Sequence, residues 1–244
     1  MPRLVCFGDS ITQGSIGTAY VAKIAHAMPH VDVLNRGIDG DTTFNLLQRV
    51  ETDVIATQPD VVSIMIGLND FGTAYGERLS RAYYRLLKRV PIAIDISVFE
   101  ALYAALIERL QRAQIAVVLF TPTTLGELPD TPGQALLDGY VAAVYRLAQQ
   151  YHLPIVDVRA AFVQAMRARP FAGPIYHLWR VPLDNIAIRT GTTYEHISRR
   201  RGFQLLVDGV HLSDAGAALV ANTVLPTLHQ LLPPDGRLHA AEEN

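Results

Sequence analysis

The sequence predicts an α/β protein, a three-layer α/β/α sandwich built on a parallel five-stranded sheet. Three observations lead to this prediction. The chain contains short segments that are apolar throughout, without the alternation of apolar and polar residues found in half-exposed strands. Such uninterrupted apolar segments are typical of strands buried on both faces. They alternate along the chain with longer segments of helical periodicity. Clusters of polar residues and glycine follow several strands, and such sheets bind ligands beyond the carboxyl ends of their strands.

The N-terminal part alternates between the two kinds of segment. Leu4–Gly8 is an apolar run that ends in Gly-Asp-Ser, and Thr18–Met28 has apolar residues at helical spacing. A second short strand is expected at Val31–Asn35 and a helix at Thr42–Ala56, where apolar residues recur on one side. Asp60–Gly67 follows a proline that ends the helical region, and its run Val-Val-Ser-Ile-Met-Ile is the strongest buried-strand signal in the chain.

The C-terminal part repeats the pattern. Phe99–Gln114 is expected to form an amphipathic helix that leads into the strand Ile115–Phe120. A helix at Gln134–Tyr151 precedes a strand at Pro154–Val158. The closing helix is expected at Ser213–Leu232, because serine suits the N-cap position and the aspartate that follows is favourable in the first turn.

Two segments, Phe71–Ser97 and Arg167–Leu206, depart from the alternation. We expect both to be insertions in a single domain that spans residues 1–232, followed by a polar tail at 233–244. Long loops in compact domains are usually lids or binding elements, so we expect a lid or side wall of the pocket. Packing of the aromatic residues onto the core is an equal alternative. The aromatic residues are Tyr83, Tyr84, Phe171, Tyr176 and Trp179, and the arginines that could meet an anionic substrate are Arg180 and Arg189.

Composition narrows the class of protein. The 244 residues are 50% hydrophobic and 18% charged, which allows a large core and argues against disorder. The formal net charge of -2 and the short basic run at Arg199–Arg201 argue against a nucleic-acid partner. Cys6 is the one cysteine, so no intramolecular disulfide can form, and its apolar surroundings predict a buried core residue. With no leader pattern and no long apolar stretch, we expect a cytoplasmic protein without stable membrane insertion, of open oligomeric state.

Three polar clusters follow the first three expected strands and contain Ser10, Gly37 and Asn69. A serine on a sharp turn can expose its hydroxyl, and a glycine lets a backbone N–H approach a substrate oxygen closely. The side-chain amide of Asn69 is a donor of the kind found in oxyanion holes. Each cluster also has an ordinary interpretation: a helix cap formed by Asp9 or Ser10, a strand-to-helix turn at Gly37 and a local Asx turn at Asn69.

A fourth cluster places Asp208 three positions before His211, just ahead of the closing helix. Histidine is the usual base that activates a serine, and a carboxylate on its other ring nitrogen fixes the tautomer. A lone histidine is more often structural, so the pair gains meaning only beside a nucleophile. Together the four clusters supply a nucleophile, a base, an orienting carboxylate and several N–H donors. That inventory indicates acyl transfer.

In combination, these clusters resemble the sequence blocks of the GDSL/SGNH hydrolase family of lipases, esterases and acylhydrolases. The resemblance extends from Phe7 to His211, and Ile11 stands where the family usually has leucine. It implies a flavodoxin-like α/β/α sandwich and serine-dependent ester hydrolysis. The matching motifs are Gly8-Asp9-Ser10, Gly37, Gly67-x-Asn69-Asp70 and Asp208-x-x-His211.

The resemblance also implies a role for each residue. Ser10 would attack the acyl carbon to form an acyl-enzyme, His211 would move the proton, and Asp208 would orient His211. The oxyanion would lie between the N–H groups of Ser10 and Gly37 and the side chain of Asn69. No metal or organic cofactor is implied, and the sequence has no metal-ligand spacing motif. The substrate would be a small-molecule, lipid or glycan ester.

Other functions fit parts of the sequence. A thioesterase, a lysophospholipase or a carbohydrate deacetylase would use the same triad. A non-catalytic flavodoxin-like binding domain, whose first loop cradles a phosphate or flavin, is an alternative of another class. The Asp208/His211 pair argues against it, because a phosphate cradle has no use for a base with an orienting carboxylate. A pseudoenzyme that binds glycans or a partner through the insertions is a third possibility.

Overall fold

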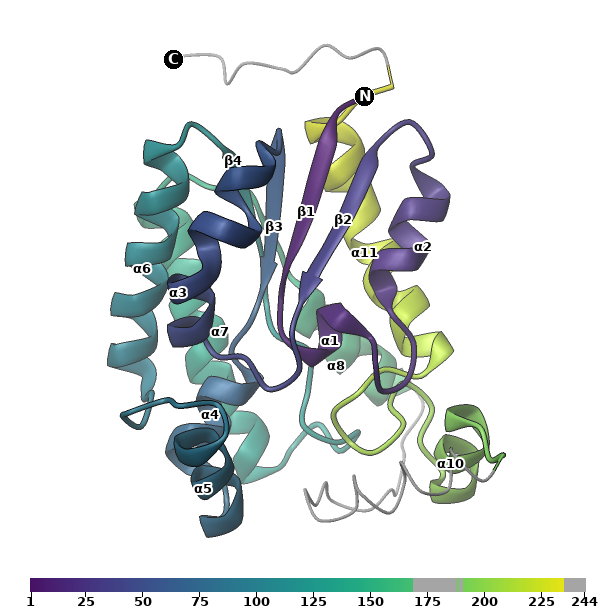
Figure 1. Cartoon of the computed structure of the whole chain (residues 1–244). Coiled ribbons are helices and arrows are strands. Elements are labelled where there is room, and N and C mark those ends of the chain that lie inside the picture. Colours follow the sequence, from purple (N-terminus) through teal and green to yellow (C-terminus); the bar gives the residue numbers. More distant parts are fainter. Residues whose placement is uncertain (169–187, 189–190, 235–244) are drawn as a thin grey trace.

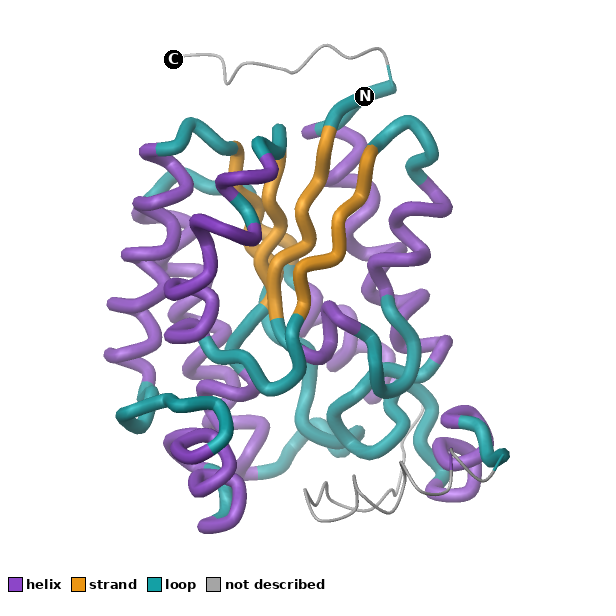
Figure 2. Tube along the Cα trace, in the orientation of Figure 1, coloured by secondary structure: helices purple, strands orange, loops and turns teal. Residues whose placement is uncertain are grey.

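The computed structural model describes residues 1–168, 188 and 191–234. Its sheet has five strands, all parallel, in the order β2-β1-β3-β4-β5 (Figures 1 and 2). This order is that of flavodoxin-like doubly wound sheets and confirms the predicted fold class. The strands are β1 (Arg3–Gly8), β2 (Asp32–Gly37), β3 (Val61–Met65), β4 (Ala116–Phe120) and β5 (Ile155–Val156).

Helices cover both faces of the sheet (Figure 1). On one face α3 (Thr43–Asp53) and α7 (Pro132–Gln150) pack on either side of α6 (Ile96–Arg112). On the other face α11 (Asp214–Leu231) packs between α2 (Tyr20–Ala27) and α8 (Val158–Ala168). The remaining described elements are α1 (Ser10–Gln13), the 3-10 helix η1 (Ile55–Thr57), α4 (Leu68–Tyr75), α5 (Arg78–Leu86) and α10 (Tyr194–Arg201).

The core lies between the sheet and these two helical layers. Every residue of β3 is buried, and β1 is buried from Leu4 onwards, as expected for the central strands of a covered parallel sheet. Cys6 is fully buried within β1, which confirms its predicted place in the core. Burial also raises the pKa of the Cys6 thiol to about 12, so it stays protonated.

The structure revises several predicted boundaries. The segment Phe71–Ser97 is not irregular, because it contains most of α4 and all of α5. Helix α6 begins at Ile96 rather than Phe99, since the Asp95 carboxylate accepts from the N–H groups of its first turn. The strand expected at Pro154–Val158 is only two residues long, and α8 starts directly at its end.

Part of the second insertion and the C-terminal tail lie outside the described residues. The expectations for Phe171, Tyr176, Trp179, Arg180 and Arg189 fall there, as does most of the segment 233–244.

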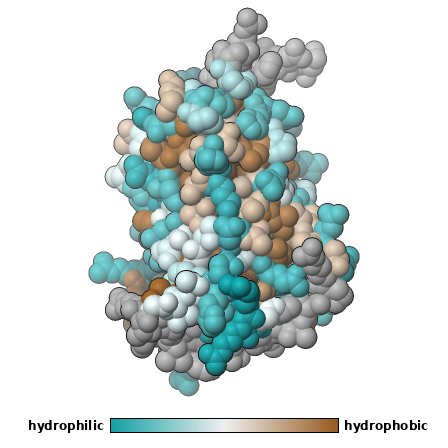
Figure 3. Space-filling view, turned by 90° about the vertical axis from the view of Figure 1, so that its right-hand side faces the viewer, coloured by the Kyte–Doolittle hydropathy of each residue, from teal (hydrophilic) through white to brown (hydrophobic). Residues whose placement is uncertain are grey.

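The surface of the α2 and α11 face mixes hydrophilic and hydrophobic residues, with one strongly hydrophilic patch in the lower half of the view (Figure 3). The basic run ends α10, where Arg199 and Arg200 are exposed. In the part of the chain that the structure describes, no helix combines the length and apolarity needed to cross a bilayer.

The carboxyl ends of β1 and β3 form the topological switch point of the sheet. The chain leaves β1 toward β2 on one side, and β3 pairs with β1 on the other. Doubly wound sheets bind ligands at such a point. In Figure 1 the helices α1, α4 and α5 gather at this edge.

Candidate active site

Ser10 lies directly beyond the carboxyl end of β1, as the first residue of α1. Asp9 is the N-cap, and its Oδ1 accepts from the Ile11 N–H at 2.9 Å. The predicted helix cap therefore belongs to Asp9 and leaves the Ser10 side chain unused for capping. Because a first-turn N–H has no acceptor within its own helix, the Ser10 N–H is also available to a ligand.

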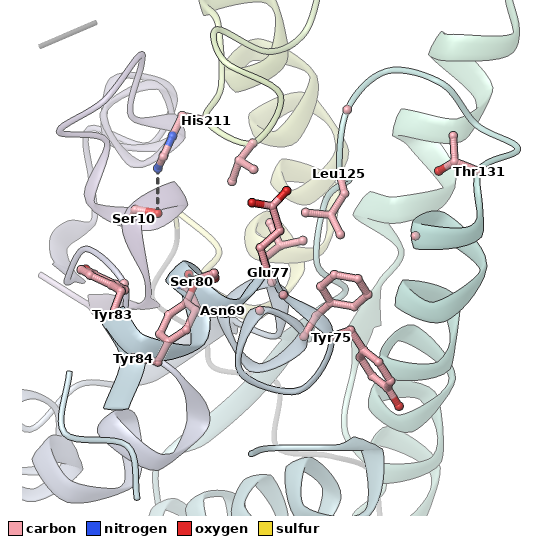
Figure 4. A pocket seen from close by; sticks show the side chains of 18 of the residues that line it. Ser10, Asn69, Tyr75, Glu77, Ser80, Tyr83, Tyr84, Leu125, Thr131 and His211 are labelled. Atoms are coloured by element: carbon pink, nitrogen blue, oxygen red, sulfur yellow. Dashed lines mark hydrogen bonds between the residues drawn. The ribbon is translucent and has the colours of Figure 1, made fainter. Parts of the chain in front are cut away.

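Ser10, His211 and Asp208 form one hydrogen-bonded chain. His211 Nε2 lies 3.1 Å from Ser10 Oγ (Figure 4). On the other side of the ring, His211 Nδ1 lies 2.7 Å from Asp208 Oδ2. The other carboxylate oxygen of Asp208 accepts from the backbone N–H groups of Val210 and His211 at 3.0 and 2.9 Å. All three residues are buried, with 6% of each exposed. The tertiary structure thus joins two segments that the sequence places at opposite ends of the chain.

The surroundings tune the charge of the histidine. Burial by itself lowers the pKa of His211, but the Asp208 carboxylate outweighs it through charge and hydrogen bonding, so the pKa is raised above its ordinary value. For Asp208 burial acts in the opposite direction and by itself would raise the pKa. The charge and hydrogen bond of His211 and the backbone N–H donors nevertheless hold the pKa of Asp208 below its usual range. Asp208 therefore stays ionised, and His211 is a stronger base than a histidine in water.

Gly37 lies at the end of β2, away from the cavity. Its N–H donates to Asn35 Oδ1 at 2.9 Å, and it is not among the residues that line the cavity beside Ser10. A Cβ at this position would collide with the backbone of Gln13 in α1. Close packing of β2 against α1 is therefore sufficient reason for a glycine here.

Gly40 and Asn69 do line that cavity, together with Ser10 and His211. Among the described residues, the Gly40 N–H has no hydrogen-bond acceptor. Asn69 sits in the first turn of α4, and its Nδ2 donates to Asp41 O at 2.9 Å and to Asp9 Oδ2 at 3.2 Å. Asn69, the amide donor expected from the sequence, thus lines the cavity, and of the two glycines Gly40 rather than Gly37 does so.

Buried carboxylates surround the site. Burial raises the pKa of Asp9 and of Asp70 to about 7 each. Asp41 is also buried, but it pairs with Arg49 at 2.7 Å and with Lys88 at 2.6 Å. Among the described residues, no cluster of three or more histidine, cysteine, aspartate or glutamate side chains is arranged to hold a metal ion.

A cavity of about 570 Å³ opens beside Ser10 and His211. Figure 4 shows these two residues at one end, with Leu125 and Thr131 at the other. Tyr83 and Tyr84 of α5 line it, which agrees with the expected side wall from the first insertion. Its lining is largely apolar away from Ser10, and the apolar side chains are Ile16, Leu68, Phe71, Tyr75, Leu125, Leu128, Pro132 and Val210.

Glu127 is a site residue that sequence reasoning missed. It is 3% exposed, and its carboxylate accepts from three consecutive backbone N–H groups, those of Gln204, Leu205 and Leu206, at 2.7 to 3.0 Å. This ties the loop after β4 to the segment that leads into Asp208. The one available signal was its position, since the loop after β4 reaches the same sheet edge as the other clusters.

Comparisons with known proteins identify the family of the chain. The chain matches the GDSL-like lipase/acylhydrolase family over residues 6–219. A curated acetylxylan esterase from Geobacillus stearothermophilus is 30% identical over 183 residues, which cover 68% of this chain and 80% of that protein. A crystal structure of an acetylxylan esterase from the same organism has 26% identity and a TM-score of 0.64, covering 92% of this chain and 93% of the other. Another acetyl xylan esterase structure, 23% identical with a TM-score of 0.65 over 93% and 99% of the two chains, shows likeness of fold.

The family match covers well over half of the chain and confirms the resemblance found in the sequence motifs. The curated relative is an esterase, which argues against the alternative of a non-catalytic flavodoxin-like binding domain. The chain belongs to the GDSL-like lipase/acylhydrolase family and is a carboxylic ester hydrolase.

Proposed function

We propose that the chain hydrolyses esters through an acyl-enzyme on Ser10, with His211 and Asp208 completing a catalytic triad. The observation that carries this proposal is the continuous chain of hydrogen bonds from Ser10 Oγ through both nitrogens of His211 to Asp208. Among the solved structures of the Geobacillus stearothermophilus esterase are catalytic mutants in which a serine or an aspartate is replaced by alanine. These mutants support a catalytic serine and a catalytic aspartate in this chain as well, which we propose to be Ser10 and Asp208.

Each step of the reaction has a residue in place. His211 Nε2 takes the Ser10 proton as Oγ attacks the acyl carbon, and Asp208 stabilises the imidazolium that forms. The tetrahedral intermediate collapses, and His211 passes its proton to the leaving alkoxide. Water then attacks the acyl-enzyme, again with His211 as base, and the acid product leaves with Ser10 restored.

We assign the oxyanion to the N–H groups of Ser10 and Gly40 and the side-chain amide of Asn69. Gly40 replaces Gly37 in this assignment, because the Gly37 N–H is already bonded to Asn35 and lies outside the cavity lining. The bond from Asn69 Nδ2 to Asp9 is long at 3.2 Å, so a developing oxyanion can displace it.

The cavity supports an ester with an apolar group larger than acetyl. Its volume of about 570 Å³ and its aliphatic and aromatic lining favour such a group, since burying apolar surface there is favourable. Carbohydrate deacetylation is a second candidate, favoured by the acetylxylan esterases among the relatives.

Replacement of the nucleophile tests the mechanism. Ser10→Ala should abolish hydrolysis of p-nitrophenyl esters and block labelling by a fluorophosphonate probe. Ser97→Ala, a serine on α6 away from the cavity, is the matched control and should keep both. Full activity in Ser10→Ala would overturn the triad.

A substrate series separates the two candidates. Acyl esters of increasing chain length and acetylated xylo-oligosaccharides would be compared by kcat/KM on the wild type. A rise in kcat/KM with chain length supports the apolar ester, whereas a preference for acetylated sugars supports the deacetylase.

A further inference from the structure

The Asn69 side chain has a hydrogen-bond partner for each of its polar atoms. Oδ1 accepts from the Tyr84 hydroxyl at 2.6 Å, while Nδ2 donates to Asp41 O and to Asp9 Oδ2. The two partners of Nδ2 are acceptors, and Tyr84 is the donor to the carbonyl end. The set of partners therefore defines which way the amide faces.

That orientation decides whether Asn69 can serve as an oxyanion donor. A flipped amide would present Oδ1 to the developing negative charge and would repel it. Asp41 O opposes the flip, because a carbonyl oxygen can only accept, and the Tyr84 hydroxyl stabilises the carbonyl end of the amide in the orientation so selected. A hydrogen bond to an amide oxygen also polarises the amide and strengthens its N–H donors.

The approach of Tyr84 depends on a glycine in α4. Gly72 follows Asn69 by three positions, so the two residues share one face of the helix. A Cβ at Gly72 would lie 2.8 Å from the Tyr84 ring, which is too close. The ring therefore rests directly on the backbone of α4, and Tyr84 is only 8% exposed.

The helix that carries Tyr84 is anchored to the loop on the other side of the candidate oxyanion site. Just beyond α5, Lys88 Nζ donates to Asp39 O at 2.8 Å and pairs with Asp41 Oδ1 at 2.6 Å. The Asn45 side chain donates to Lys88 O at 3.0 Å. The bonds of Lys88 with Asp39 and Asp41 join the end of α5 to the segment that contains Gly40, so the Tyr84 hydroxyl is presented from an anchored helix.

We infer that Tyr84 is a positioning residue for ester hydrolysis, which holds the Asn69 amide with its N–H donors toward the oxyanion. The inserted helix α5 thus contributes to the reaction itself as well as forming a cavity wall. This inference rests on the proposed function, because it assumes that Asn69 stabilises the oxyanion.

A double-mutant cycle tests the inference. Tyr84→Phe keeps the ring and removes the hydroxyl; kcat should fall roughly threefold to tenfold, the effect of one neutral hydrogen bond, with KM little changed. Asn69→Ala should lower kcat by roughly a hundredfold or more. In the Asn69→Ala background, Tyr84→Phe should cause no further loss, because Tyr84 acts through the amide that is missing.

Tyr145→Phe is the matched control, since its hydroxyl donates to Asp157 at the same distance of 2.6 Å but lies away from the cavity. It should keep wild-type kcat, and thermal unfolding of all variants would show whether each remains folded. An equal loss from Tyr84→Phe in both backgrounds would mean a merely structural role and would overturn the inference, as would wild-type kcat in Tyr84→Phe. If Ser10→Ala is inactive, the proposed triad is supported whatever the Tyr84 variants show. If Ser10→Ala is active, the proposed function itself is wrong.

Discussion

Ser10 Oγ and His211 Nε2 lie 3.1 Å apart although 201 positions separate the two residues in the chain. Backbone bonds hold the two loops in register. The Thr18 N–H, in the segment that follows α1, donates to Leu212 O at 2.9 Å, directly beside the histidine. Gly209 O accepts from Gly126 N–H, which joins the loop after β4 to the same turn. The geometry is therefore preformed, and four predictions follow from it and from its surroundings.

The first concerns the orienting carboxylate. Asp208→Asn should lower kcat by roughly a hundredfold to ten-thousandfold, because an amide at this position favours the wrong histidine tautomer. Steady-state kinetics on a p-nitrophenyl ester would measure the loss. Asp138→Asn, an aspartate on α7 that does not line the cavity, is a suitable comparison. An unchanged rate in Asp208→Asn would show that another group orients His211.

The second concerns pH. His211 must be neutral to accept the Ser10 proton, and its pKa is raised above the ordinary value of 6.5. The acid limb of kcat/KM should therefore have its midpoint above about 6.5, with activity lost as the pH falls. Asp208→Asn removes the carboxylate that raises this pKa, so the limb of its residual activity should move to lower pH. A profile that stays flat from about pH 8 to about pH 5 would contradict His211 as the base.

The third concerns the buried glutamate. Glu127→Gln replaces a charged acceptor of three backbone N–H groups by an amide that brings its own donors into the same space. The free energy of unfolding should fall by about 2 kcal/mol, the scale of hydrogen bonds to a charged group. Urea unfolding would measure this, with Glu51→Gln on the exposed side of α3 as the control. Equal stability of the two variants would contradict a stabilising role for the hydrogen bonds of Glu127.

The fourth concerns the buried carboxylate of Asp70. Its Oδ1 accepts from Thr43, while Oδ2 has no hydrogen-bond partner among the residues that the structure describes. Burial raises the pKa of Asp70 from 3.8 to about 7. The folded protein thus binds this proton more tightly than the unfolded chain. Between about pH 4 and about pH 7 stability should fall as the pH rises, because the unfolded chain binds fewer protons.

Asp70→Asn should weaken that dependence, while the similar shift at Asp9 leaves part of it in place. Urea unfolding at about pH 5 and about pH 8 would compare the variant with the wild type. The exposed Asp130→Asn should behave as the wild type. The same pH dependence in Asp70→Asn and the wild type would refute the assignment.

Most of the fold could be predicted because its strands and helices differ in apolar period. The strand at Leu4–Gly8 and the helix at Gln134–Tyr151 agree with the structure to within two residues at each end. The segment Phe71–Ser97 was recognised as an insertion, but its helix α5 was not predicted, because α5 carries several arginines among its apolar residues and buries only Tyr84. The short α1 was likewise beyond a periodicity argument, since it is held by the Asp9 cap.

In the candidate site, too, some residues could be proposed from the sequence and others could be distinguished only in the structure. Ser10, Asn69, Asp208 and His211 could be proposed from the sequence because residue type and spacing indicate their chemistry. The sequence could not distinguish Gly37 from Gly40, since both are glycines of the same polar cluster, three positions apart. Only the hydrogen bond from the Gly37 N–H to Asn35 and the position of Gly40 at the cavity separate them.

The sequence by itself determined the parallel sheet, the sheet edge that holds the site, and the residues able to carry acyl transfer. These depend on local properties, namely apolar period and the chemistry of side chains that follow strands. The tertiary structure alone decided which glycine lines the cavity and that Tyr84 on an inserted helix meets Asn69. Such contacts join segments whose relative positions depend on packing of the whole chain, and no local pattern encodes them.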